Sequence, residues 1–132
     1  MYLDVLPLQN NTLRLCRVYG DEPCIALPEV LPGEDGTPLP ITELGDYCFS
    51  EKPRSLPAPE QRMRYALRAD GCAERVSEKT DLHPVCGNFV EEITLPETLR
   101  VVGSCAFYNC RKLRRLSVGS GELVVGSDVF LN

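Results

Sequence analysis

The residues best suited to chemistry in this sequence are its cysteines and its single histidine. The seven cysteines are Cys16, Cys24, Cys48, Cys72, Cys86, Cys105 and Cys110. Together with Cys72, the pair His83 and Cys86 has the side chains that a structural zinc site uses. Such a site takes four cysteine or histidine ligands, usually with a paired Cys-x-x-Cys spacing. Because this stretch offers three and the chain has no second histidine, we predict no metal site and no cofactor.

Cysteine catalysis would need a thiolate beside an imidazole that a third group orients. His83 is the only imidazole and lies in a polar segment just before Pro84, and no oxyanion-hole motif accompanies any cysteine. We therefore predict no catalytic residues and a protein that is not an enzyme. The cysteines are instead expected to be mostly buried packing thiols.

The N-terminal segment gives no sign of export. It lacks a basic stretch followed by an uninterrupted apolar run, and nowhere does the chain reach the roughly 18 consecutive apolar residues of a membrane span. This predicts a cytoplasmic protein with reduced cysteines, with a surface or secreted location as the alternative.

The overall charge excludes two further classes of partner. The formal net charge is −5 at pH 7, so no global positive field draws the protein to nucleic acid or to an anionic lipid surface. We expect no nucleic acid and no membrane partner. A protein partner, whose identity the sequence does not reveal, remains the natural expectation.

The elements that position the charged residues are set by a repeat. Within Val90–Phe130 one pattern occurs twice, so that Ile93 and Leu116, and likewise Phe107 and Phe130, are 23 residues apart. A fixed period of this size with recurring Leu, Ile and Val indicates a solenoid with one coil per repeat.

A looser copy of the pattern spans Cys24–Phe49, with a longer loop, and about 35 residues are inserted between this copy and the next. The fold class predicted is a β-rich (α+β) solenoid that forms a single domain. Its parts are an N-terminal β-hairpin cap at 1–23, a first coil at 24–49, a helical insertion at 50–85 and two further coils at 86–132.

The inserted segment is predicted to contain a helix over residues 59–70. Pro59 suits the first position of a helix, and Met63, Ala66 and Leu67 would share one face. The arginines Arg62, Arg64 and Arg68 would decorate this helix, and we take them as candidate protein-binding residues. Alternatively, the helix packs on the solenoid and covers an edge of a coil.

A second group of candidate protein-binding residues comes from the repeat. Glu92 should lie one strand, about 4.8 Å, from Arg115, with Glu91 and Arg114 beside them. Opposite charges so placed attract across strands. They form either a charged recognition face or only local pairs on a solvated surface, worth about 0–1 kcal/mol. The nearby basic run Arg111–Arg115 is taken as a local patch.

Aromatic residues recur at the repeat spacing. Phe49, Phe107 and Phe130 occupy equivalent positions, which predicts a stack of rings through the core. Gly103 and Gly126 recur at the turn of each coil, where we expect glycine to allow a backbone geometry that a side chain would resist.

Val90 through Cys110 resembles the BspA-type bacterial leucine-rich repeat, whose coils run roughly Leu-x-x-Ile-x-Leu-Pro-x-x-Leu-x-x-Ile-Gly-x-x-Ala-Phe-x-x-Cys. The next coil keeps the opening Leu113 but has Gly119 for proline and Val129 for alanine. The resemblance implies a leucine-rich-repeat fold and a role in adhesion or protein recognition, with no catalytic residues.

The function predicted is therefore a non-enzymatic protein-interaction module. The alternative is a structural subunit of a larger assembly, such as a phage or cell-envelope particle. In that case the subunit would dock, or associate with itself, through the C-terminal coil, which ends without an evident cap.

Overall fold

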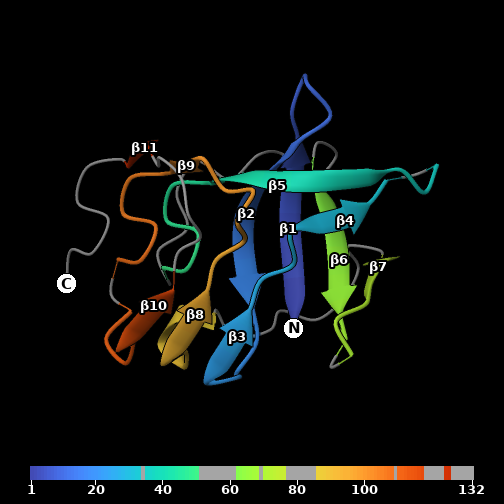
Figure 1. Ribbon diagram of the computed structural model, residues 1–132. Helices are drawn as coiled ribbons and strands as arrows, with labels where there is room; N and C mark the ends of the chain where they lie inside the picture. Colours follow the sequence, from blue (N-terminus) through green and yellow to red (C-terminus); the bar gives the residue numbers. More distant parts are fainter. Residues whose placement is uncertain are drawn as a thin grey trace.

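The computed structural model describes most of the chain. The described residues are 1–33, 35–50, 62–68, 70–76, 86–108 and 110–117, and the backbone of Val124–Val125. Strands dominate these ranges, which contain one short 3-10 helix, Cys86–Asn88, and no α-helix (Figure 1). In these same ranges no helix is long and apolar enough to cross a membrane.

The chain begins with an antiparallel hairpin. Strand β1 (Tyr2–Pro7) pairs with β2 (Leu13–Tyr19), and the turn between them places Asn11 at a positive φ of 60°. Asparagine tolerates this left-handed conformation better than most residues. Leu3 in β1 and Leu15 in β2 are fully buried, so the hairpin packs on the core.

Each copy of the repeat contributes one strand to each of two sheets. The first strands of the three copies are β3 (Cys24–Ala26), β8 (Glu92–Thr94) and β10 (Arg115–Ser117), which form a parallel three-stranded sheet. The second strands are β5 (Pro38–Leu44), β9 (Val101–Val102) and β11 (Val124–Val125), which are parallel neighbours in a larger sheet. Figure 1 shows the two sets at opposite ends of the molecule. The 23-residue register is confirmed: Leu116 pairs with Ile93, and Val124 with Val101.

The larger sheet continues past the repeats towards the N-terminal end. Its order is β11-β9-β5-β2-β1-β6-β7, and β4 (Val30–Pro32) pairs with β5. β2 runs parallel to β5, whereas β1, β6 (Met63–Leu67) and β7 (Ala73–Val76) follow one another in antiparallel pairs. The second strands of the repeats and the hairpin therefore belong to one sheet.

The predicted fold class, an α+β solenoid with a helical insertion at 50–85 whose helix spans 59–70, is wrong. Residues 62–68 and 70–76 contain the antiparallel pair β6–β7, and β6 pairs with β1. Residues 59–61 and 69 lie outside the described ranges. The β6 segment forms a strand because β1 has a second edge that must be paired. Without β6, the backbone groups at that edge of β1 and the carboxylate of Asp4 would lack partners.

The core of the repeats contains two of the three aromatic rings of the predicted stack. Phe49 and Phe107 are buried, and their rings stack with centroids 5.2 Å apart and planes 12° apart. This part of the predicted stack is confirmed. Phe130 lies outside the described residues.

Candidate functional site

The three-stranded sheet presents one row of side chains to solvent. Cys24, Glu92 and Arg115 are directly opposite one another on β3, β8 and β10. The next residue of each strand turns inward, and Ile25 and Ile93 are buried. This alternation across a strand is what the sequence predicted. We call the outward side of these strands, together with Glu91 and Arg114, the charged face.

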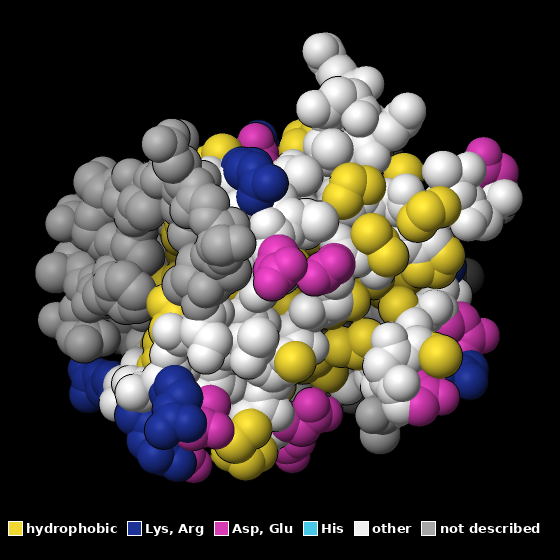
Figure 2. All heavy atoms as spheres, viewed as in Figure 1, with side chains coloured by type: hydrophobic (Ala, Val, Ile, Leu, Met, Phe, Trp, Pro, Cys, Tyr) yellow, Lys and Arg dark blue, Asp and Glu magenta, His cyan; other side chains and the backbone are white. Residues whose placement is uncertain are grey.

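Ion pairs link the strands of the charged face. Arg114 Nε donates to Glu91 Oε1 at 3.3 Å, and its Nη2 lies 3.7 Å from Glu92 Oε1. Arg115 Nε lies 3.7 Å from the same Glu92 oxygen. The Arg114 and Arg115 side chains remain 64% and 69% exposed. Figure 2 shows Lys and Arg side chains gathered over β10 at the lower left, with acidic side chains against them.

At the other edge of the charged face, the exposed thiol of Cys24 donates to Glu92 Oε2, with sulfur and oxygen 3.2 Å apart. This hydrogen bond to a carboxylate raises the pKa of Cys24. A raised pKa keeps the thiol protonated and makes it a poor nucleophile.

Four of the buried thiols are also kept protonated. Burial raises the pKa of Cys16 to about 11 and those of Cys86 and Cys110 to about 12, and it raises the pKa of Cys48 as well. Within the described ranges no three Cys, His, Asp or Glu residues are grouped so as to hold a metal ion. His83, which both the zinc and the catalytic hypotheses needed, lies outside those ranges.

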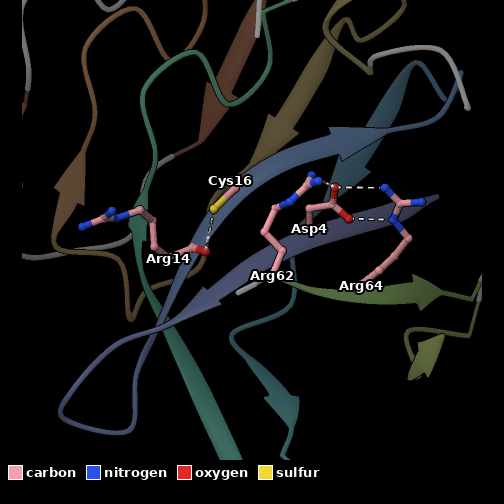
Figure 3. A network of polar contacts seen from close by, with 5 residues as sticks. All are labelled: Asp4, Arg14, Cys16, Arg62 and Arg64. Carbon is pink, nitrogen blue, oxygen red and sulfur yellow. Dashed lines mark hydrogen bonds and ion pairs between the residues drawn. The ribbon is translucent and has the colours of Figure 1, made fainter. Parts of the chain in front are cut away.

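The arginines of the inserted segment are placed in two different environments. Arg64 in β6 forms a two-pronged contact with the fully buried Asp4 of β1: its Nε donates to Oδ1 at 2.7 Å and its Nη2 to Oδ2 at 3.1 Å. Arg62 Nη1 donates to Asp4 Oδ2 at 3.0 Å. Figure 3 shows the two guanidinium groups approaching Asp4 from opposite sides. Arg68, by contrast, is exposed and pairs with Glu74.

A further arginine faces this network from β2. Arg17 is opposite Asp4 across the β1–β2 pair, is 1% exposed, and donates from Nη1 to the backbone oxygen of Tyr47 at 2.6 Å. Asp4 and Arg17 were not identified from the sequence. The sequence did contain a signal for a strand at this segment. Arg62 and Arg64 alternate with Met63 and Tyr65, and a period of two residues is that of a strand.

The seven predicted residues are thus not brought together in one site. Glu91, Glu92, Arg114 and Arg115 lie in one exposed face. Arg62 and Arg64 are directed into the molecule, 13% and 9% exposed. Arg68 lies at the β6–β7 turn, in the opposite half of the molecule from β10 (Figure 1).

Comparison with known proteins gives one structural likeness. No protein-family model matches the chain, and no curated protein matches its sequence. The crystal structure of a leucine-rich cell surface protein from Faecalibacterium prausnitzii A2-165 is similar, with a TM-score of 0.58 over 94% of this chain and 20% sequence identity. The chain spans 24% of the length of that protein. At this identity the likeness shows a fold of the leucine-rich-repeat kind.

Proposed function

We propose that the protein is a non-enzymatic interaction module that binds another protein through the charged face. The observation that carries the proposal is the group of Glu92 and Arg115, paired on β8 and β10, with Glu91 and Arg114 immediately before these strands. The inward residue of β8, Ile93, is buried in the core, and that of β10, Leu116, packs against it. Because the backbone is held on both sides of β8 by parallel pairing, the charged side chains start from a defined arrangement, which lowers the entropy cost of binding. The fold of the leucine-rich-repeat kind and the resemblance to BspA-type repeats agree with such a role.

A non-enzymatic role is supported by the state of the thiols. Cysteine catalysis needs a lowered pKa, whereas every described cysteine with a shifted pKa has it raised. The proposal therefore assigns no reaction to the cysteines.

Affinity capture from the source organism tests the proposal. The baits are the wild-type chain, the face variant Arg114→Glu/Arg115→Glu and the control variant Arg68→Glu/Arg75→Glu. The control reverses the same number of exposed charges at the β6–β7 end of the sheet. We expect a protein that the wild type and the control retain and the face variant loses.

Either of two results contradicts the proposal. If no bait retains a protein above a blank resin, the chain is not an interaction module under these conditions and the proposal fails. If the control loses the protein and the face variant retains it, recognition belongs to the inserted segment, where Arg68 lies.

One further observation favours a second candidate function, a structural subunit. β10 and β11 are the last strands of the two sheets in the described part of the chain, and both belong to the third repeat. Strand edges of this kind can pair with another chain. Scattering that rises with concentration would support self-association through this end. If the protein stays monomeric at high concentration, self-association through this end is contradicted, and the charged face remains the proposed contact surface.

A further inference from the structure

The turn before β10 adds two exposed cations to the charged face. Arg111 and Lys112 are exposed, and with Arg114 and Arg115 they place four positive charges within five residues. We call Arg111, Lys112, Arg114 and Arg115 the basic patch. Backbone hydrogen bonds hold the turn, because Leu113 N donates to Cys110 O at 3.2 Å and Cys110 N to Phe107 O at 3.1 Å.

Among the described residues, the carboxylates nearby balance only half of this charge. Glu91 and Glu92 pair with Arg114 and Arg115, and no described acidic side chain is within ion-pair distance of Arg111 or Lys112. The four cations and two carboxylates sum to +2. Since the whole chain carries −5, the rest of the sequence carries −7. The basic patch is therefore a local positive surface on an acidic molecule.

An aromatic ring lies beside the basic patch. Lys112 Nζ is 6.0 Å from the centroid of the half-buried Phe89 ring, a cation–π distance. Phe89 is anchored by its backbone amide, which donates to Cys86 O at 2.9 Å. The patch thus combines two cations that lack an acidic partner among the described residues with an aromatic surface.

We propose that the basic patch binds an acidic segment of the partner protein, a short run of Asp or Glu residues. This rests on the proposed function and names the chemistry of the partner. Carboxylates would pair with Arg111 and Lys112, which have no acidic partner among the described residues, and charge complementarity of this kind sets specificity and speeds association. The observations favour an acidic protein segment over nucleic acid, because the basic patch holds only four cations and the rest of the sequence, with a formal charge of −7, would repel a polyanion that extends past them.

A titration followed by two-dimensional NMR tests the inference. The probe is a capped hexaglutamate peptide, with capped hexalysine and a single-stranded oligonucleotide as comparison ligands. We expect hexaglutamate to shift the backbone amides of Phe89 and of residues 110–117, and the shifts to weaken with added salt because exposed charges are screened. Hexalysine should leave these amides unchanged.

Charge-reversal variants locate the binding. In Arg111→Glu/Lys112→Glu two attractions become repulsions at an exposed site, so hexaglutamate should bind about tenfold more weakly or worse. Arg68→Glu/Arg75→Glu should bind it as the wild type does. Unshifted patch amides, equal affinity of the patch variant, or tighter binding of the oligonucleotide would each overturn the inference.

The two proposals fail separately. If a captured protein depends on Arg114 and Arg115 but hexaglutamate does not perturb the basic patch, the inference fails and the proposed function stands. If hexaglutamate binds the patch but no bait retains a protein, the proposed function fails.

Discussion

At two positions glycine is required because a side chain would not fit, and not because of its backbone conformation. A Cβ on Gly103 would lie 2.6 Å from the backbone nitrogen of Asp46, in the turn of the preceding repeat. The same approach lets Ser104 N donate to Asp46 Oδ1 at 2.8 Å. The sequence predicted that glycine is needed here for its backbone geometry. In the structure Gly103 has no positive φ, and the reason is instead a close contact between successive turns.

Gly87 offers the sharpest test of this close packing. A Cβ there would lie 1.7 Å from Phe49 O and 3.0 Å from Cys110 Sγ. We expect Gly87→Ala to lower the free energy of unfolding by about 3 kcal/mol or more, because backbone must move. Urea denaturation measures this.

Gly36→Ala is the matched control for that substitution. Gly36 has a φ of 83° and nothing within 4 Å of a built Cβ, so only conformational strain of about 1–2 kcal/mol is expected. Equal losses for the two variants would show that the contact between Gly87 and Phe49 is not tight.

The buried thiols predict loss of stability at alkaline pH. The pKa values of Cys16, Cys86 and Cys110 rise from 9.0 to about 11 or 12. Below pH 9 these thiols are therefore neutral in both the folded and the unfolded chain, and their contribution to the free energy of unfolding is fully present. Above it the unfolded chain releases protons that the folded chain retains, which favours unfolding by up to about 1.4 kcal/mol per thiol and pH unit.

Urea midpoints at about pH 8 and about pH 10, with a reducing agent present, measure this loss. The variant Cys86→Ala/Cys110→Ala should lose less stability over the same interval, because two of the titrating groups are gone. A wild-type midpoint that does not fall, or one that falls equally in the variant, would argue against protonated buried thiols.

At the scale of elements, the repeat was predictable and the insertion was not. The 23-residue spacing of Ile93 and Leu116 sets the register of β8 and β10 directly, because repeated residues must occupy equivalent rungs. In the insertion, Met63, Ala66 and Leu67 also satisfy the spacing of a helix face. Pairing with β1 decided the outcome, and that contact joins residues about 60 positions apart in the sequence, beyond the reach of a local pattern.

The backbone geometry of the turns also could not be predicted from the sequence. Tyr47 and Cys105 occupy equivalent turns and have φ values of 59° and 56°. Neither residue type favours the left-handed region, so composition gives no signal for it. The recurrence in two repeats indicates that the stacked turns impose the conformation.

We expect the carboxylate of Asp4 to stabilise the contact between β1 and β6. Asp4→Asn would leave Arg62 and Arg64 without their shared carboxylate in a buried site, a change that typically costs about 3–5 kcal/mol. Chemical denaturation measures the cost. For Glu74→Gln, which removes the exposed partner of Arg68, we expect a much smaller loss of stability, because solvent screens the pair. Comparable losses would mean that the Asp4 network does not hold β6 in place.

At the scale of the whole molecule, the insertion extends the sheet on the N-terminal side of the repeats, while the charged face lies on the other sheet. The sequence correctly placed Glu92 opposite Arg115, because strand alternation and the repeat period are local rules. It could not show that Arg62 and Arg64 are directed towards Asp4, since that requires knowing which strand β6 joins.

We propose that β1, β2 and β6 stabilise the fold and that β8 and β10 bind the partner protein. Backbone amide hydrogen exchange of the chain, alone and bound to its captured protein, tests this most directly. We predict slower exchange on binding in residues 91–94 and 110–117, with exchange in Met63–Val76 unchanged. Slowing confined to Met63–Val76, with none in the three-stranded sheet, would contradict it.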